Sequence, residues 1–287
     1  MTDPQAIRED ADRVARIALA EDGGRDITTE VTVPPQAMAL GRIECRAPAV
    51  LAGVAWTDAI VRGCDLPPIA WSANEGDRLS TGEVPGMLRG DFVRLLRAER
   101  PMLNLLQRAS GIATATRAFV DRVAGTRATI LHTRKTTPGL RLLEVQAVIA
   151  GGGAVHRLDL SHTVMVKDNH WRVLEQSGRT LAEALNRARA VGVTACYVEV
   201  ESPAQVELAC AAGATRLLID NQAPETVRKW GTVARHLRPG IEIEATGGIT
   251  LENVRAYAEA GSDFISIGAL THSARAADIA LELAASA

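Results

Sequence analysis

The stretch CYVEVESPAQVELACAAGATRLLIDN (residues 196–221) decides the fold, because it reads as strand, helix and strand. Its outer runs, CYVEVE and RLLIDN, are short and largely apolar, and both end in acidic or amide side chains. Between them, Ser202 followed by Pro203 is typical of a helix start, and Gln205 is placed to close a capping box. Gly213 is typical of the residue just after a helix. The stretch therefore predicts a βαβ unit with parallel strands.

The same pattern extends outward from this stretch. Thr180 with Glu183 predicts one further helix, and Thr250 opens another that stops before Gly261. Six strands with polar tips predict a βα barrel or an open doubly wound sheet, and in either fold the ligand site lies at the carboxyl ends of the strands. The four other short runs that end in polar residues are ATILHT (128–133), TVMVKD (163–168), IEIEAT (241–246) and DFISIG (263–268).

The first 108 residues show a different sequence pattern. A helical start precedes the β-like runs GRIECRA (41–47) and VLAGVAW (50–56), and Pro-Pro and Asn-Glu-Gly-Asp segments mark turns between such runs. The segment from Glu83 to Val123 then predicts the edge of a strand followed by long helices. A separate N-terminal domain is therefore expected.

Composition excludes several classes of function. A net charge of −2 and 3% aromatic residues argue against nucleic acid as a partner. The polar start MTDPQAIREDADR predicts no signal peptide, and we expect no membrane partner because no apolar run is long enough to cross a bilayer. The four cysteines show no metal-ligand spacing and are interpreted as reduced thiols of a cytoplasmic protein.

Lysine is scarce, and its placement is informative. Three of the 32 basic residues are lysines, and two of them, Lys135 and Lys167, lie in the dense polar motifs HTRKTTPG (132–139) and VKDNH (166–170). Lysine offers a compact, movable charge, whereas arginine offers a flat fork. A chance distribution in an arginine-rich chain is the alternative interpretation.

The polar tips divide into a cationic and an anionic group. A cationic cluster in a nearly neutral protein indicates a small ligand with several negative charges; the alternative is a set of structural salt bridges to strand-end acids. A loop at Gly151–Gly153 is interpreted as letting the neighbouring cations move towards the rim. The cationic group comprises Arg134, Lys135, His156, Arg157 and Lys167.

The anionic group contains Glu199 and Asp220, with Glu201 on the same face as Glu199. These carboxylates could bind Mg²⁺, hold sugar hydroxyls or stabilise a developing cation. The last two strands end in Thr246-Gly247-Gly248 and Gly268, and glycines before a helix allow backbone N–H groups to approach a phosphate. The histidines lack the helical spacing of a zinc site.

Together these motifs resemble one family, the quinolinate phosphoribosyltransferases. The resemblance covers residues 99–274 in the family's order, and EDGGRDITT (21–29) is similar to an N-terminal segment of the family. The chain departs from the family pattern at Val145, Val155, His162 and Thr246, which leave the proposed ligand contacts in place. The matching stretches are ERPMLNLLQRASGIATATR (99–117), TRKTTPGLR (133–141), GGGAVHR (151–157), VKDNH (166–170), VEVES (198–202), LIDN (218–221) and ATGGITLENVRAYAEAGSDFISIGALTHSA (245–274).

The resemblance implies an enzyme that uses Mg²⁺ to convert quinolinate and phosphoribosyl pyrophosphate into nicotinate mononucleotide, CO₂ and pyrophosphate, in NAD biosynthesis. It implies an N-terminal α/β sandwich domain (1–110, joined by 274–287), an incomplete six- or seven-stranded βα barrel (111–273), and a homodimer or a larger assembly built from it. Mg²⁺ would be held through the substrate phosphates, with Glu199 and Asp220 as further ligands.

The resemblance also implies roles for individual residues. Lys135, Glu199 and Asp220 would be catalytic. Quinolinate would be held by Arg100 of the other subunit and by Thr133, Arg134, His156, Arg157 and Lys167. Phosphoribosyl pyrophosphate would be held by Lys135, Glu199, Asp220, Asn221, Thr246, Gly247, Gly248, Gly268, Ala269 and His272.

Three other functions are considered. A paralogous phosphoribosyltransferase would act on another pyridine or aromatic carboxylate. A Schiff-base aldolase would need Lys135 or Lys167 in an apolar pocket that lowers its pKa, but both have polar neighbours in sequence. A silent ligand-binding relative would not need the whole set of charged residues.

Overall fold

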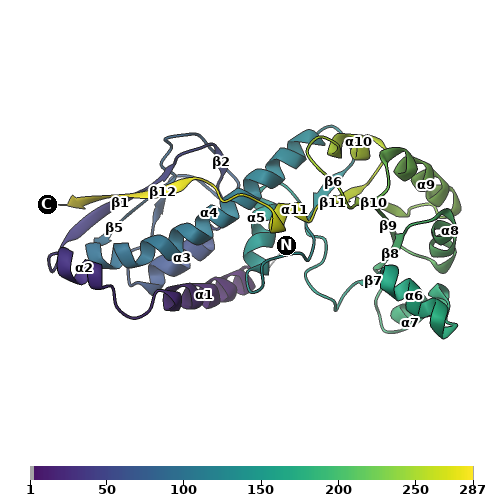
Figure 1. The fold of residues 1–287 in the computed structure, drawn as a ribbon, viewed down its shortest axis with the longest axis horizontal. Coiled ribbons are helices and arrows are strands. Elements are labelled where there is room, and N and C mark those ends of the chain that lie inside the picture. Colours follow the sequence, from purple (N-terminus) through teal and green to yellow (C-terminus); the bar gives the residue numbers. More distant parts are fainter. Residues whose placement is uncertain (1–2, 287) are drawn as a thin grey trace. The chain divides into compact units, whose positions relative to one another are not determined.

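The six apolar runs form six parallel strands of one sheet in the computed structural model, which describes residues 3–286. The strands pair in the order β6-β11-β10-β9-β8-β7. The sheet curves strongly but stays open between its two outer strands, β6 and β7 (Figure 1). An incomplete βα barrel is therefore confirmed. The strands are β6 Thr129–Leu131, β7 Val164–Val166, β8 Cys196–Val200, β9 Arg216–Asp220, β10 Glu242–Thr246 and β11 Phe264–Ser266.

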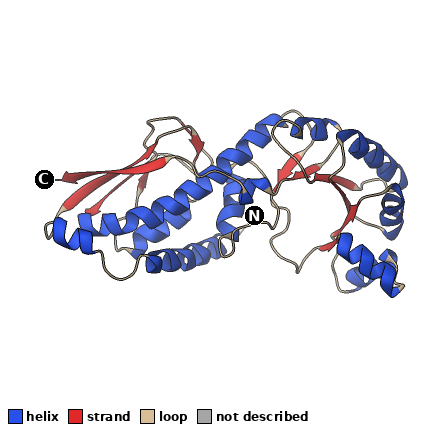
Figure 2. Cartoon of the chain, viewed as in Figure 1, coloured by secondary structure: helices blue, strands red, loops and turns tan. Residues whose placement is uncertain are grey.

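Helices line the convex side of this sheet (Figure 2). The capping box of Thr180 and Glu183 is confirmed: each side chain accepts a hydrogen bond from the other's backbone N–H. Ser202 also caps its helix, but the Gln205 side chain accepts from the N–H of Glu201 and not from that of Ser202. The helices are α6 Asp168–Ser177, α7 Leu181–Ala190, α8 Pro203–Ala212, α9 Pro224–Leu237 and α10 Val254–Glu259.

Two predicted elements are placed wrongly. The helix expected to open at Thr250 begins at Val254, because Asn253 Oδ1 accepts the Thr250 N–H and holds the intervening residues in a turn. The run VLAGVAW (50–56) is not a strand. Only Val50 is in a strand, and the left-handed backbone of Gly53, with a φ of 90°, redirects the chain into helix α3 (Val54–Gly63).

The N-terminal region forms an antiparallel sheet of order β12-β1-β5-β3, with helices along one face (Figure 1). Alternate residues of β1 are buried, including Ala39, Ile43 and Cys45, as expected for a sheet covered on one side. The α/β character of this region is as predicted. The remaining helices and strands of the chain are α1 Pro4–Glu21, α2 Ile27–Thr32, β1 Met38–Cys45, β2 Ala49–Val50, α3 Val54–Gly63, β3 Ala70–Trp71, β4 Arg78–Leu79, β5 Gly86–Asp91, α4 Phe92–Arg122, α5 Arg141–Ala150, α11 Ala269–His272 and β12 Ile279–Ser286.

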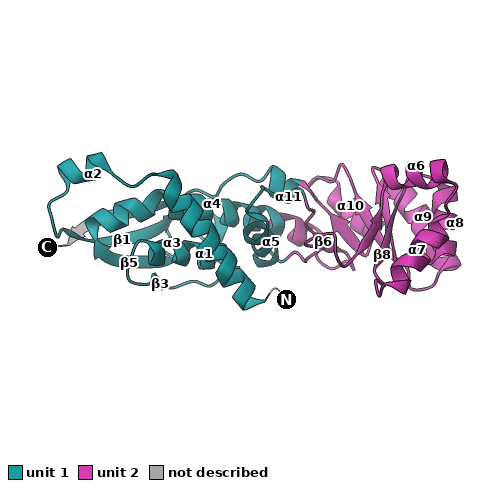
Figure 3. Ribbon diagram, turned by 90° about the horizontal axis from the view of Figure 1, so that it is seen from below, with its two compact units in different colours: residues 1–117, 135–152, 269–287 teal, residues 118–134, 153–268 magenta. Residues whose placement is uncertain are grey.

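The chain divides into two compact units (Figure 3). Unit 1 comprises the described parts of Met1–Arg117 and Ala269–Ala287 together with Lys135–Gly152, and unit 2 comprises Ala118–Arg134 and Gly153–Gly268. This division assigns α5 to unit 1. The C-terminal strand β12 pairs along the whole of β1.

Among the described helices, none combines the length and the apolar character that a membrane-spanning segment needs.

Two helical glycines allow a matched test of packing in the fold. A Cβ on Gly111 of α4 would overlap the carbonyl oxygen of Arg275, whereas one on Gly231 of α9 would make ordinary contacts with Ile243 at 3.5 Å and Arg235 at 3.6 Å. We expect Gly111→Ala to lower the free energy of unfolding by about 1–3 kcal/mol. Gly231→Ala should raise it by about 0.5–1 kcal/mol, because alanine is the better helix former. Urea denaturation measures both, and an unchanged stability of Gly111→Ala would contradict the packing described.

Candidate active site

The polar tips of the strands in unit 2 meet at one edge because the sheet is parallel. Asp220 of β9 lies opposite Thr246 of β10, and Glu199 of β8 lies opposite Leu218 of β9. Leu218 in turn lies opposite Glu244. Strand tips that are far apart in sequence are therefore neighbours at the carboxyl edge, where βα folds place their ligands.

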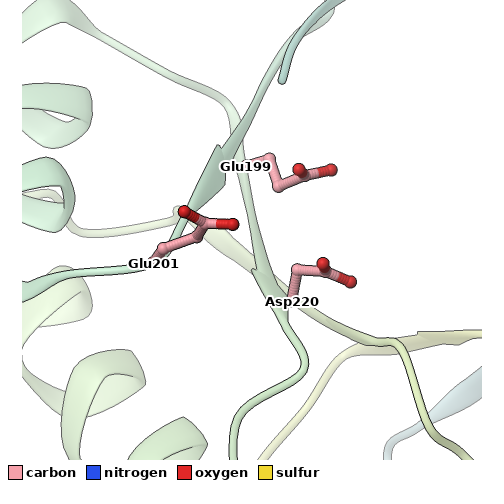
Figure 4. A group of neighbouring side chains, drawn as sticks. All are labelled: Glu199, Glu201 and Asp220. Carbon is pink, nitrogen blue, oxygen red and sulfur yellow. The ribbon is translucent and has the colours of Figure 1, made fainter. Parts of the chain in front are cut away.

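Three carboxylates cluster at this edge. Oxygen atoms of Glu199, Glu201 and Asp220 lie within 4.8 Å of one another. Figure 4 shows Glu199 and Asp220 projecting to the same side, while Glu201 approaches from the segment that follows β8. Glu199 is buried, Asp220 is half-buried and Glu201 is exposed. A set of carboxylate oxygens is the donor type that a hard divalent cation such as Mg²⁺ prefers.

Lys167 is tied to this cluster. Its Nζ lies 3.1 Å from Glu199 Oε2, because Val166 lies opposite Val198 and the next residues of the two strands are therefore neighbours. The Lys167 side chain is 47% exposed, so this ion pair is screened by solvent. His170, in the same motif, accepts the backbone N–H of Lys167 and caps α6. His170 therefore has a local structural role.

Arg134 and Arg157 form a cationic pair. The pKa of Arg157 is lowered, first by burial and then by the charge of Arg134, while Glu244 and Asp159 oppose this shift. Among the described residues, Arg157 has no hydrogen bond or ion pair, and the buried Nε of Arg134 has no hydrogen-bond partner. Two guanidinium groups that repel each other and retain donor capacity are suited to bind an anionic ligand.

A buried group of charges lies below the edge, and sequence reasoning missed it. His156 Nε2 lies 3.1 Å from both carboxylate oxygens of Glu244, which is fully buried. Arg216 binds the same carboxylate at 3.0 Å and Glu242 at 2.8 Å. The alternation Glu242, Glu244, Thr246 was the available signal, since a period of two places these side chains on one face of β10.

The Thr246-Gly247-Gly248 turn has the backbone conformation that its glycines allow. Both glycines have positive φ, 81° and 61°. The turn is held to the end of β9, because the Asn221 N–H donates to the Thr246 carbonyl at 2.9 Å. The Asn221 amide in turn donates to Asp220 at 2.7 Å. The turn and the tip of β9 are thus one hydrogen-bonded structure.

The other predicted site residues fall in several places. Thr133 follows β6 and its carbonyl contacts His132 Nδ1, while Gly268 follows β11. In unit 1, the Lys135 carbonyl accepts from Thr271 Oγ1 at 2.8 Å, and His272 Nδ1 lies 2.7 Å from Ser273 Oγ. Four predicted site residues belong to unit 1, namely Arg100, Lys135, Ala269 and His272. Their roles remain predictions.

The glycine run before His156 is not simply a mobile loop. A Cβ on Gly151, which ends α5, would lie 2.5 Å from the Ala113 carbonyl oxygen and from Thr116 Cβ. Gly151 is therefore required by close packing. Beyond the run, Ala154 makes a parallel bridge to Leu131, which anchors this segment beside the outer strand β6.

Two family models match the chain in sequence. The model described as quinolinate phosphoribosyl transferase, N-terminal domain, matches residues 26–110. The model described as quinolinate phosphoribosyl transferase, C-terminal domain, matches residues 112–282. Together they cover most of the chain.

Individual proteins are similar over nearly the same length. The chain is 41% identical to the nicotinate-nucleotide pyrophosphorylase (carboxylating) of Mycobacterium leprae over 275 residues, which are 93% of this chain and 95% of that protein. It is 45% identical to the probable nicotinate-nucleotide pyrophosphorylase (carboxylating) of Bacillus subtilis over 73% of this chain and 71% of that protein. The crystal structure of NadC from Streptococcus pyogenes superposes with a TM-score of 0.89 and 33% identity, covering 100% and 99% of the two chains.

The glycine turn allows a test of anion binding. We expect Gly247→Ala to weaken the binding of inorganic pyrophosphate about tenfold, equivalent to about 1.4 kcal/mol. A Cβ there would meet Asn221 Oδ1 and lie 2.8 Å from Asp220 Oδ1, so it would displace the tip of β9. Gly248→Ala is the matched control, because its φ is also positive but its nearest neighbour is 3.9 Å away. Isothermal titration calorimetry measures both, and equal losses would indicate backbone strain alone.

Proposed function

The chain belongs to the quinolinate phosphoribosyltransferase family, and from this premise we propose that it transfers the phosphoribosyl group of phosphoribosyl pyrophosphate to quinolinate. The products are nicotinate mononucleotide, CO₂ and pyrophosphate, so the enzyme serves NAD biosynthesis. The observation that carries the proposal is that unit 2 holds both the Arg134–Arg157 pair and an acidic cluster at the carboxyl edge of its sheet. The cationic half suits an anionic acceptor, and the anionic half suits a reaction in which positive charge develops on the donor sugar.

The cationic half would hold quinolinate. The molecule carries two carboxylates, and each guanidinium can bind a carboxylate through two parallel N–H donors. Burial, and after it repulsion from Arg134, lowers the pKa of Arg157, and this repulsion is relieved when a dianion lies between the two guanidinium groups. Thr133, His156 and Lys167 would complete this half. In the homodimer that we propose, Arg100 of one subunit would reach the acceptor site of the other.

The anionic half would hold the phosphoribosyl donor. Loss of pyrophosphate from the sugar carbon develops oxocarbenium character, and the carboxylates of Glu199 and Asp220 are suitable counter-charges for it. The glycine turn offers backbone N–H groups to a phosphate. Lys135 and His272 would add positive charge near the leaving pyrophosphate. The remaining donor-binding residues that we propose are Asn221, Thr246, Gly247, Gly248, Gly268 and Ala269.

Decarboxylation follows from the change in the acceptor ring. After transfer, the ring nitrogen is cationic. When the bond between C2 and its carboxylate breaks and CO₂ leaves, the bonding electron pair stays on C2, where the adjacent positive nitrogen stabilises it until C2 takes up a proton. The cations of the site therefore have to orient this carboxylate without binding it so strongly that its departure is hindered. A cation whose charge is already balanced by an acid of the protein binds a carboxylate less strongly and therefore suits this requirement. Lys167, which contacts Glu199, is such a cation.

We propose Mg²⁺ as the cofactor. The clustered oxygens of Glu199, Glu201 and Asp220 fit such an ion, and the substrate phosphates would supply further ligands. When bound, Mg²⁺ neutralises charge on the pyrophosphate group. We also propose a cytoplasmic location. The four cysteines are buried free thiols, and burial raises the pKa of each, which suits a reducing compartment.

The acceptor is tested by assaying the purified enzyme with phosphoribosyl pyrophosphate, Mg²⁺ and either quinolinate or nicotinate. We expect CO₂ and pyrophosphate to be released in equal amounts with quinolinate, and no turnover with nicotinate. The second carboxylate is needed to satisfy both arginines, which explains the expected preference. Pyrophosphate release with nicotinate but not with quinolinate would favour the paralogous phosphoribosyltransferase.

Arg157→Ala tests the assignment of the cationic half. We expect the KM for quinolinate to rise about 10- to 100-fold, as for the loss of a charged hydrogen-bond donor, with little change in the KM for phosphoribosyl pyrophosphate. Arg187→Ala is the control. Arg187 is exposed in the last turn of α7, at the opposite end of the barrel from the carboxyl edge. Equal losses of both affinities in Arg157→Ala would contradict the assignment.

A further inference from the structure

We propose that Glu244 is a positioning residue that makes His156 a cationic ligand for an acceptor carboxylate. This inference rests on the proposed function. Glu244 lies inside the barrel on β10 and would not touch the substrate; it would act only through the imidazole ring that it holds.

The contact between the two side chains determines that one hydrogen lies on His156 Nε2. His156 Nε2 lies 3.1 Å from both oxygens of Glu244, and the His156 side chain is only 7% exposed. Burial raises the pKa of Glu244, but the hydrogen bonds from His156 and Ser266 and the charges of His156 and Arg216 outweigh it, so that the net pKa lies below the usual value. An ionised carboxylate can only accept hydrogen bonds. Nε2 must therefore carry a hydrogen and donate it.

This assignment restricts the other ring nitrogen. With Nε2 protonated, Nδ1 is an acceptor in the neutral ring and a donor in the imidazolium. A neutral ring would present a lone pair to a carboxylate and repel it. His156 can therefore help to hold quinolinate only when it is doubly protonated, and an adjacent carboxylate is the group that stabilises this state.

The charges around the ring favour the same state. Arg216 is the buried cation of the cluster, and it is shared between Glu244 and Glu242. Within this group of contacting side chains, two acids and one guanidinium leave one negative charge, which a cationic His156 would balance. Arg216 itself is fixed between the rings of Tyr197 and Phe264, with its guanidinium carbon 4.3 and 3.8 Å from the ring centroids.

The remaining neighbours of His156 are accounted for. The Tyr197 ring meets the imidazole edge-on, with centroids 5.8 Å apart and an interplanar angle of 82°. Ser266 of β11 contacts Glu244, not the ring. Arg157, which follows His156 in sequence, is a further cation that senses the charge of Glu244, and Arg134 lies close to Arg157. Glu244 is thus the acidic group in direct contact with the ring among the described residues.

Glu244→Gln is the decisive variant, because it keeps the side-chain shape and one acceptor oxygen while removing the charge. We expect the KM for quinolinate to rise about 10- to 100-fold with little change in the KM for phosphoribosyl pyrophosphate. The alkaline limb of the kcat/KM profile for quinolinate should move to lower pH, because the carboxylate that contacts the imidazolium is gone. Glu244→Asp retains the charge, so its alkaline limb should lie closer to that of the wild-type enzyme than the limb of Glu244→Gln does.

The His156→Gln background separates positioning from structural support. If Glu244 acts through the ring, Glu244→Gln adds little to the quinolinate KM once His156 is absent. A full additional loss in the double variant would overturn the proposal, as would an unchanged pH profile in Glu244→Gln. No turnover of quinolinate by the wild-type enzyme would instead reject the proposed function.

A second measurement decides the matter if Glu244→Gln does not fold. In the wild-type protein, ¹⁵N NMR of the imidazole nitrogens reports which of them carry hydrogen, and His156 can be assigned by its absence in His156→Gln. We expect Nε2 to be protonated at every pH at which the protein is folded, and both nitrogens to be protonated when quinolinate is bound. A neutral ring with hydrogen on Nδ1 would overturn the proposal.

Discussion

Parallel pairing of the six strands is the constraint on which the candidate site depends. It brings the carboxyl ends of all strands to one edge, and its register then decides which side chains meet. Asp220 is next to the Thr246 turn, and Lys167 is next to Glu199, because the strands that carry them are aligned in this way. A slip of one residue in β10 would turn Glu244 away from His156. The chemistry of the edge is therefore set by backbone hydrogen bonds.

Below that edge, the sheet buries charged side chains, Arg216 and Glu244, at positions where apolar side chains are more usual. The Arg216 guanidinium lies between two aromatic rings, and its Nε and Nη1 bind two carboxylates, so both its edge and its flat faces are used. Breaking one partner of such a group leaves a buried charge without compensation, which commonly costs about 3–5 kcal/mol. The cluster holds His156 at a defined position although His156 comes from a segment outside the six strands.

Much of the fold could be predicted from sequence, because apolar runs with polar tips and helix caps are local signals. The buried cluster could not, since it depends on contacts between strands. IEIEAT was interpreted as an apolar run, and the side chains that satisfy Glu242 and Glu244 come from β9 and from the segment after α5. The failure at VLAGVAW has a different cause: β-branched and aromatic residues favoured a strand, but Gly53 starts a helix whose Trp56 is buried.

The cations of the site differ in how far the protein already neutralises them, and this difference bears on the reaction. Lys167 and His156 each contact a carboxylate of the chain, Glu199 and Glu244 respectively. Arg134 and Arg157 instead oppose each other. In the proposed acceptor site, a dianionic acceptor would gain most of its attraction from the arginine pair, because only there would binding remove an existing repulsion. Lys167 and His156, whose charges are balanced by acids of the chain, would orient a carboxylate while attracting it less strongly. A carboxylate held in this way would leave more readily as CO₂.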